Sequence, residues 1–454
     1  MSLDLEWNVT IGGLDTNTDF TDRVAGINIK QPLGFMQPSA HLVTITLNNF
    51  DGALTPGAGG TYSSVEWFQQ AVFISCTINT TDTAEVFHGI IDDFDISDDG
   101  VTSMVTLTAS DWLSIGARGL YGNDFTNSTS YDWTEWANRI IDGFTFQGVS
   151  SGSTLPKLDQ DMGVYRGFAG DVSYYAAGTV TTGFKGEAGN SLGDVMIARH
   201  QAGVPSVIWP TTIDKWVILG NDFARYDAAI VGDTLSRTDA NATTFVFTEG
   251  TPASGELPVN AIDRGYDIER VINQATIKSS FTTNTVEADN STSISATGIK
   301  SLFASDSSML LDTDTQRMAD NIVERFSNIH FQARKISVQS ATLADTNSGS
   351  KEELARLLDV RYGLWQNATV TYTPTAGTQV TDNCVIAGRT IQAVPGRTTI
   401  TLNLLPAEDY QSFVLDSNLL GVLGGTLDTY DKATYTYDED VLYNGVPVHG
   451  FRLG

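Results

Sequence analysis

Hydrophobic and polar positions alternate through the opening third of the chain. Four segments place apolar side chains at every second position, namely residues 5–11, 43–47, 72–78 and 101–109. A period of two with one apolar face is typical of a half-buried antiparallel strand. The pattern therefore predicts short strands joined by turns, with the turns at the DG of 51–52 and the DDG of 98–100.

Three other segments carry apolar residues at helical spacing: residues 131–142, 191–201 and 312–329. In the last of these, an apolar stripe runs from Ala319 to Phe326 behind Asp312, which is a candidate N-cap. Residues 150–190 are rich in Gly, Ser and Thr, which predicts loops and short strands. The fold is expected to be mainly β (α+β), with few helices.

Two distant stretches, residues 71–111 and 368–408, follow the same order of features. Each has a strand, a polar turn, a strand ending in glycine, a short strand, a glycine turn and a long strand with Thr on one face. This order indicates two copies of one small β-domain near opposite ends of the chain, and convergence between unrelated meanders is the alternative. The matched landmarks are Gly89 and Gly388, Gly100 and Gly396, and the final acids Asp111 and Glu408.

The charge of the chain is strongly acidic. Its 454 residues, enough for roughly three domains, include 26 basic and 54 acidic side chains, a net charge of −28. Such a surface repels phosphate backbones, so specific nucleic-acid binding is not expected. The bias is strongest in residues 31–117, which hold ten acids and no Lys or Arg. It suits either an ordinary soluble surface or a surface that must not adhere to DNA.

Cysteine content and hydropathy exclude several classes of protein. Cys76 and Cys384 are the only cysteines and both lie in strand-like runs, so neither a disulfide framework nor a CxxC metal site is expected. The first residues, MSLDLEWNVT, lack the basic and apolar regions of a signal peptide. No window approaches about 18 apolar residues, so no membrane insertion is expected.

Residues 95–100 (DISDDG) resemble the first half of a calcium loop. Asp95 and Asp99 have the required spacing, but Thr106 stands where the loop needs a bidentate Glu. A hairpin turn accounts for the same residues and is the favoured interpretation.

No set of catalytic residues can be named. Asp92 and Asp93 are adjacent and would point to opposite faces of a strand, which argues against a glycosidase pair. No nucleophile elbow, phosphate loop or dinucleotide fingerprint occurs. No two histidines stand four residues apart, so a zinc site has no local support. We therefore predict no enzyme, and no catalytic, cofactor-binding or metal residues; the histidines are His41, His88, His200, His330 and His449.

The C-terminal segment, residues 408–454, mixes tyrosines with acidic residues. Aromatic side chains among acids suit a sugar-binding face, and equally an extended arm whose Tyr rings anchor it on a partner. The glycine-rich stretch 421–425 (GVLGG) precedes the tyrosines like a hinge, which favours the arm. The tyrosines are Tyr430, Tyr435, Tyr437 and Tyr443.

Taken in order, these segments resemble phage tail hub proteins, the minor tail or baseplate hub components at the tip of the tail. VTITLNNFDGALTP is similar to the family's strand followed by Asn-x-Asp-Gly and Pro, and VFHGIIDDFDI with VTLTASDWLSIG to the end of its first domain. SLGDVMIARHQAG, VPSVIWPTTIDKWVIL, YDIERVINQATIK, ADNSTSISATGIKSL, DTDTQRMADNIVERF and FQARKISVQSATL follow in the family's order. LDVRYGLWQNATVTYTP through VIAGRTIQAVPGRTTITLNLLPAE is the strongest piece. Thr297 departs from the pattern, which has an aromatic residue before Gly298.

The resemblance implies two related antiparallel β-barrel, tube-like domains with an inserted mixed domain that carries a few helices. We expect four parts. They are a first hub domain at 1–112, a middle domain at 113–207 completed by 305–345, a second hub domain at 208–304 and 346–410, and an arm at 411–454.

The resemblance also implies a function and a set of partners. Three chains with two copies each would form a homotrimeric, pseudo-sixfold ring that joins a tail tube or distal tail protein to a threefold tip. A tape-measure protein and a central fibre or tip protein are the further expected partners. DNA would pass through an acidic lumen without specific binding. The expected location is the tail tip of the virion, after assembly in the host cytoplasm, and no cofactor is implied.

Two other functions remain open. One is a carbohydrate-binding or carbohydrate-active β-protein of the virion, and the other is the spike hub of a secretion system or tailocin. In the hub interpretation the opening stretch HLVTITLNNFDGALTP (41–56) is architecture rather than a site. Asn48, Asp51 and Gly52 are expected to satisfy backbone groups at a turn, and Pro56 to stiffen the chain that follows.

Overall fold

The structure is a computed structural model. It describes residues 5–13, 16–32, 39–57, 59–62, 67–68, 70–78, 83–111, 113–114, 244–279, 284–307, 312–343, 347–360 and 363–410, with short strands between 157 and 236 and between 441 and 448.

Seven strands make up the N-terminal part of the main sheet, and the four segments with alternating hydrophobicity all form strands. The 310-helix η1 (Thr21–Arg23) lies among them. The strands are β1 (Glu6–Gly13), β2 (Thr16–Asp19), β3 (Val24–Pro32), β4 (Leu42–Asn48), β5 (Ala71–Thr77), β6 (Thr83–Asp98) and β7 (Ser103–Ser110).

Seven later strands join the same sheet, which confirms a mainly β fold. The 310-helix η4 (Ser340–Thr342) follows the fourth of them. They are β13 (Phe245–Glu249), β14 (Glu256–Val259), β15 (Ala261–Tyr266), β19 (Phe331–Gln339), β20 (Asn367–Tyr372), β21 (Val380–Val394) and β22 (Arg397–Pro406).

A smaller sheet and four helices complete the larger described segments. The helix expected at 312–329 is present and ends at Phe326, whereas those expected at 131–142 and 191–201 lie outside the described residues. The small sheet has the order β17-β16-β18. Its strands are β16 (Gln274–Ser279), β17 (Thr285–Asp289) and β18 (Ser301–Ser307), next to η3 (Ile268–Arg270); the helices are α5 (Ser291–Thr297), α6 (Asp312–Phe326), α7 (Ser348–Leu358) and α8 (Ala407–Tyr410).

Short strand pairs occupy parts of the remaining chain. They are β9 (Val207–Thr212) with β10 (Lys215–Leu219) and β8 (Lys157–Leu158), β11 (Ala229–Val231) with β12 (Thr234–Ser236), and β23 (Val441–Tyr443) with β24 (Val446–Val448).

The two stretches that look alike in sequence fold into the same motif. In β5-β6-β7, Ile90 pairs with Ala71 on one side and Ser110 on the other. In β20-β21-β22, Val385 pairs in the same way with Asn367 and Leu405. The register then shifts just after each of these rows, between Ile91 and Asp93 in β6 and between Ile386 and Gly388 in β21.

These registers correct one landmark of the repeat. They place Asp93, not Gly89, at the position of Gly388, because the bulge follows the three-strand row at the same distance in both motifs. Gly89 is required for a separate reason: a Cβ atom there would lie 2.2 Å from the carbonyl oxygen of Ser110. Gly100 and Gly396 do correspond, since both occupy the hairpin turn with φ of 80° and 77°.

The strands around each motif also correspond. In the first unit β7 pairs with β4 and β4 with β3; in the second, β22 pairs with β19 and β19 with β15. On the other side, β1 runs antiparallel to β5, whereas β13 runs parallel to β20. The two units therefore share a topology that diverges at this outer position.

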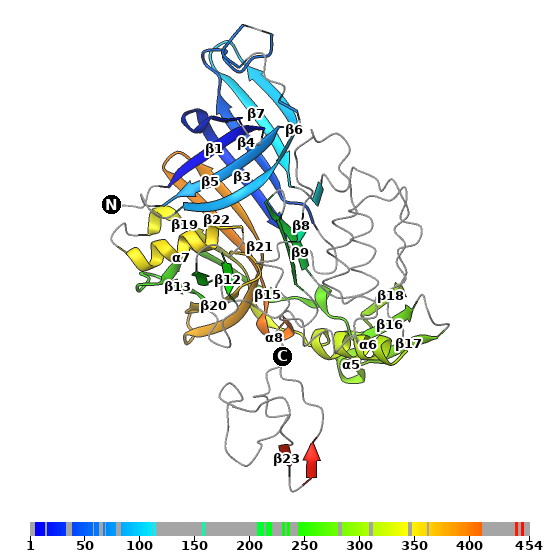
Figure 1. Cartoon of the computed structure of the whole chain (residues 1–454). Coiled ribbons are helices and arrows are strands. Elements are labelled where there is room, and N and C mark those ends of the chain that lie inside the picture. The colour runs from blue at the N-terminus through cyan, green and yellow to red at the C-terminus, as the bar shows by residue number, and fades with distance from the viewer. Residues whose placement is uncertain are drawn as a thin grey trace.

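The two units are joined edge to edge by β3 and β21, so the strands of both units form one continuous sheet (Figure 1). Within the described residues no ring of strands closes, which corrects the expectation of two barrels. In the first unit, the edge of β3 that faces away from β4 pairs with residues Gly388–Ala393 of β21 in the second unit.

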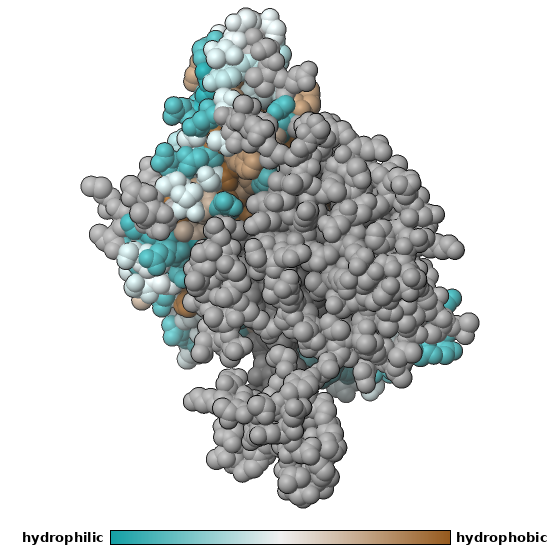
Figure 2. Space-filling view, in the orientation of Figure 1, coloured by the Kyte–Doolittle hydropathy of each residue, from teal (hydrophilic) through white to brown (hydrophobic). Residues whose placement is uncertain are grey.

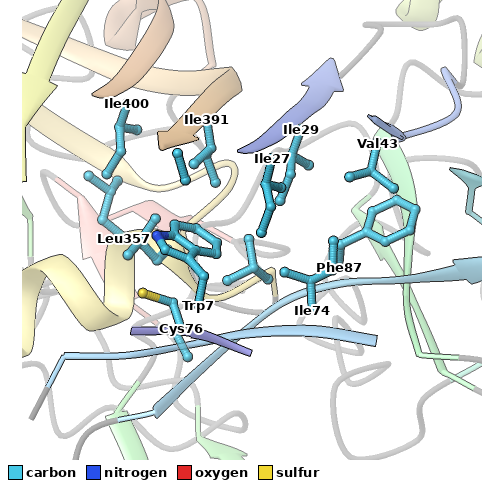
Figure 3. Close-up of a cluster of buried hydrophobic side chains, with 14 of the residues drawn as sticks. Trp7, Ile27, Ile29, Val43, Ile74, Cys76, Phe87, Leu357, Ile391 and Ile400 are labelled. Atoms are coloured by element: carbon cyan, nitrogen blue, oxygen red, sulfur yellow. The ribbon is translucent and has the colours of Figure 1, made fainter. Parts of the chain in front are cut away.

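One hydrophobic core serves both units. Trp7, Ile29 and Cys76 from the first unit cluster with Leu357 and Ile400 from the second (Figure 3). The Trp7 indole Nε1 donates to the Thr398 hydroxyl at 3.0 Å, across 391 residues of sequence. Burial of this shared apolar surface, rather than two separate cores, holds the sheet together.

A buried arginine lies at the junction of the two units. Arg389 of β21 is 1% exposed, and its Nε donates to the Gln31 side chain of β3. Its Nη1 donates to the carbonyl oxygens of Leu357 and Asp359 at the end of α7. Gln31 in turn donates to the Val86 carbonyl oxygen at 2.9 Å. Because carbonyl groups at a helix C-terminus carry partial negative charge, they stabilise the cation there.

Arg389→Met should lower the free energy of unfolding by about 2–4 kcal/mol, because several buried acceptors would lose their donor. Urea unfolding followed by Trp fluorescence measures the change. The matched control is Arg397→Met, since Arg397 is an exposed residue that follows the adjacent hairpin turn. An unchanged midpoint in Arg389→Met would mean that removing a buried cation offsets the lost hydrogen bonds.

Candidate functional site

One face of the joined sheet is mainly polar around the junction of the two units, although Leu42 on this face is 45% exposed. A single row of paired residues crosses six strands from β6 to β22, and every side chain in it is polar and at least partly exposed. Directly paired residues share a face of the sheet. The row consists of Asp93, Thr108, Thr44, Asn28, Gln392 and Thr399.

The neighbouring row faces the opposite way and is fully apolar. Its members are 0–1% exposed and belong to the shared core. This alternation is what assigns the polar row to the outside of the sheet. The row consists of Ala109, Val43, Ile29, Ile391, Ile400 and Val338.

The polar face is mostly uncharged, with acids at one end and lysines toward the other. Asp93 and Asp95 lie on β6 and are exposed, whereas Lys30 and Lys335 lie toward the second unit. Threonine hydroxyls occupy the strands between them. The part of the face on β6, β7 and β4 carries acids and no Lys or Arg, so it offers phosphate groups little attraction. Figure 2 shows that the described surface seen from one side is largely hydrophilic, with smaller hydrophobic areas.

The acidic residues at 98–100 form the β6–β7 hairpin turn. Asp99 accepts hydrogen bonds from the backbone nitrogens of Val101 at 2.9 Å and Thr102 at 2.6 Å, and these bonds lower the pKa of its carboxyl group. Asp98 accepts from the Gly100 nitrogen at 2.9 Å. The carboxylates therefore satisfy the turn itself. Among the described residues no group of three or more His, Cys, Asp or Glu side chains gathers as metal ligands do.

The opening stretch is also architectural, but through Asn49 rather than Asn48. Asn49 is fully buried, accepts from the Leu54 nitrogen at 2.8 Å, and donates to Thr55 and Ser103. Asp51 accepts two hydrogen bonds from Arg23, at 2.7 and 2.9 Å, and these hold the pKa of its carboxyl well below the ordinary value.

Two histidine–aspartate pairs lie at comparable ends of the two units. His41, just before β4, lies against Asp111, just after β7, with Nδ1 and Oδ2 3.7 Å apart. His330, just before β19, contacts Asp409 with Nε2 and Oδ1 2.9 Å apart. Asp409 also accepts from Arg270 at 3.1 Å. Both pairs connect the ends of neighbouring strands. Of the other histidines, His88 stacks on Phe73 with ring centroids 4.0 Å apart, and His200 and His449 lie outside the described residues.

Burial controls the ionisation of the first pair. It lowers the pKa of His41 to about 3, and the charge of Arg389 adds to this effect. It raises the pKa of Asp111 to about 7, although backbone donors from His41, Ser114 and Leu113 oppose the shift. His41 is therefore neutral at pH 7, and Asp111 takes up a proton below that pH.

The remaining predicted features carry no site in the described chain. Cys76 and Cys384 are buried and free, and burial raises the pKa of both thiols, that of Cys384 to about 12. Asp92 and Asp93 differ in exposure, and only Asp93 belongs to the polar row. The side chains of the tyrosine-rich arm lie outside the described residues. Within the described part of the chain no helix is long and apolar enough to cross a membrane.

Sequence reasoning did not find Arg389, Gln31 or Asn49. Each stands in a strand or turn pattern that predicts an exposed polar residue. Gln31 and Arg389 are bound by partners distant in sequence, whereas Asn49 is bound by Leu54 and Thr55 nearby and by Ser103. One signal was available for Arg389: no other charged residue lies between Val385 and Val394, in a run that is otherwise rich in apolar residues.

Asp111→Asn should change how stability depends on pH. A raised folded pKa means that the native chain keeps a proton that the unfolded chain releases between pH 4 and 7. Asp111 therefore contributes stability that is fully present below about pH 4 and is lost as pH rises toward 7. The wild-type free energy of unfolding minus that of the variant should fall by up to about 1.4 kcal/mol per pH unit across this window.

Urea unfolding of both proteins at several pH values between 4 and 8 tests this expectation. Asp99→Asn is the matched control, because that carboxyl is exposed and its pKa is lowered rather than raised. If the wild-type free energy of unfolding minus that of Asp111→Asn rises with pH, the pKa of Asp111 is lowered in the folded chain and the expectation is wrong.

Comparisons with known proteins give similarity at the level of structure alone. No protein-family model matches the sequence, and no curated protein matches it either. The chain is similar to the tail protein from Neisseria meningitidis MC58, with a TM-score of 0.48, 10% identity, and 88% of this chain and 96% of that chain covered.

Two further solved structures are similar to this chain at 10% identity. One is the 43 kDa tail protein of prophage MuSo2 from Shewanella oneidensis, with a TM-score of 0.46 and coverage of 89% of this chain and 99% of that one. The other is prophage tail protein gp18 from Listeria monocytogenes EGD-e, with a TM-score of 0.43 and coverage of 87% and 94%.

Proposed function

We propose that this chain is a structural hub of a bacteriophage tail tip and not an enzyme. Three copies form a ring that joins the tail tube or distal tail protein to a threefold tip. The tape-measure protein and a central fibre or tip protein are its other partners, and its place is the virion tail tip after assembly in the host cytoplasm.

The single observation that carries this proposal is the repeated motif. β5-β6-β7 and β20-β21-β22 have the same register at their central row and a bulge at the same place. The strands that flank them on one side, β4 and β3 or β19 and β15, follow the same order. A threefold assembly of such a chain presents six similar units, which is what contact with a sixfold partner requires.

The polar face suggests how DNA would pass. In the proposed ring this face lines the channel, with Thr108, Thr44 and Thr399 providing hydroxyl groups and Asp93 and Asp95 providing negative charge. Lys30 and Lys335 add positive charge only toward the second unit. Hydroxyl groups and carboxylates do not hold a phosphate backbone, whereas a lysine-lined wall would. Non-adhesion is the property that a DNA conduit needs.

We also propose how the chain divides into structural parts. Residues 1–112 form one hub unit, and 208–304 with 346–410 contribute to the other. The expected assignment of all of 305–345 to the middle segment is corrected for β19 (Phe331–Gln339), which pairs with β15 and β22 and therefore belongs to the second unit. The middle segment at 113–207, together with the rest of 305–345, is an insertion between them. The arm at 411–454 extends to a neighbouring component.

Mass measurement of the purified protein tests the proposed assembly. We expect a species of three times the 48.9 kDa chain mass, and negative-stain images of a ring with six similar lobes. A protein that stays monomeric at high concentration and is absent from phage particles would remove the proposal.

Reversing charge on the polar face should slow DNA ejection without unfolding the protein. In particles carrying Asp93→Lys with Asp95→Lys, both at exposed positions, we expect ejection about two- to tenfold slower at low salt, because the new cations attract phosphate. Adding salt should restore the rate.

The matched control is Glu324→Lys with Glu352→Lys, which makes the same charge change on exposed positions of α6 and α7. Ejection at the wild-type rate in the Asp93/Asp95 particles, with normal particle yield, would show that this face does not line the DNA path.

A further inference from the structure

The β3–β21 junction has an equivalent position between the two units at which no described strand pairs. On one edge, β21 pairs with β22; on the other edge it pairs first with β20 and then, beyond the bulge, with β3. The matching strand β6 pairs with β7 on one edge and with β5 on the other. Among the described strands, none pairs with β6 beyond the bulge on the β5 edge.

The strand that would fill this position is the counterpart of β3. In the first unit, Asn28 of β3 pairs with Thr44, which pairs with Thr108. In the second unit, the equivalent row is Asp263 of β15, Lys335 and Asn403. β15 therefore occupies the place of β3, and within the described chain its outer edge pairs with no strand.

Exposure differs between these equivalent positions in the way that a missing partner predicts. Ile29 and Gln31 of β3 are both 0% exposed, because β21 covers them. Tyr266 of β15 is 60% exposed, and its ring packs against that of Phe331 with centroids 4.9 Å apart and ring planes tilted by 56°. On β6, Ile96 is 37% exposed although its counterpart Ile391 is fully buried. Among the described strands, both edges are thus unpaired and each exposes an apolar side chain.

We propose that β15 of one chain pairs antiparallel with residues 94–98 of β6 in a second copy of this chain. This inference rests on the proposed ring and names the contact that closes it. The register of the β3–β21 junction, carried over, sets Tyr266 opposite Phe94 and Asp263 opposite Ser97. Main-chain hydrogen bonds supply the affinity of such strand addition, and side chains set the register.

Charge supports this partner. The β15 edge carries Arg264 and Asp263, and the adjacent strand β19 carries Arg334, which lies 3.7 Å from Asp263, and Lys335. These side chains have more positive than negative charge, whereas the β6 edge carries Asp95 and Asp98. In the carried-over register, Arg264 lies diagonally across from Asp98 on the same face. Cross-strand pairs of opposite charge stabilise a sheet and suppress slipped registers.

The contact is head to tail, because β15 and β6 are different surfaces of the same chain. A head-to-tail contact forms a closed ring only when its rotation returns to the start. With three copies, three β15–β6 junctions between chains alternate with three β3–β21 junctions inside chains. The sheet then runs without an open edge at these positions.

Thiol cross-linking tests the proposed contact in the full chain. The pair Asp263→Cys with Ser97→Cys places two thiols opposite each other at the junction, whereas the native Cys76 and Cys384 are buried. Treatment with a short bis-maleimide should then yield linked dimers and trimers on a denaturing gel. The matched control combines Asp263→Cys with Asp93→Cys, four residues away on the same strand, and each single variant should yield neither product.

The outcomes separate this contact from the proposed ring. Linked trimers from the Ser97 pair, with much lower yield from the Asp93 pair, support the contact and its register. A trimer by mass that gives no linked product from the Ser97 pair, or more from the Asp93 pair, overturns the contact while the ring stands. A monomer by mass in wild type and variants overturns both.

Discussion

The pairing of β3 with β21 is the constraint on which the rest of this structure depends. It joins strands whose contacting residues are more than 350 positions apart, and it makes one sheet and one core out of two units. Arg389 lies at this seam, where its guanidinium satisfies a side chain from the first unit and carbonyl groups from α7. A buried cation with this many partners tolerates little displacement, so it fixes the angle between the units as well as their contact.

The strands and turns were largely predictable because their causes are local. Alternation specifies which face of β4 or β7 is buried, and Asp99 with Gly100 favours the hairpin wherever it occurs. The same is true of α6, whose apolar stripe runs from Ala319 to Phe326. α7 was missed even though Asn347 caps it and Leu354, Leu357 and Leu358 lie at helical spacing, because its first turn is built from Ser and Gly.

The neighbours of each strand could not be predicted in the same way. Period-two alternation states which side chains face inward but does not state which strand lies alongside. For this reason the sequence pattern matches Gly388 with Gly89, whereas the strand registers match it with Asp93. For the same reason the sequence predicts two separate barrels, whereas β3 pairs with β21. The polar row is an example. The alternation within each strand predicts that its threonines face outward, but the continuity of the row across six strands depends on pairings between distant segments.

The opposite directions of β1 and β13 have a geometric consequence. Both lie outside the repeated motif, yet one runs antiparallel to its neighbour and the other parallel. In a ring of the proposed kind, the inner wall would repeat every sixty degrees while the outer rim would repeat every hundred and twenty. A component that contacts the inner wall would thus meet sixfold symmetry, whereas a component that contacts the outer rim would meet threefold symmetry on the same ring.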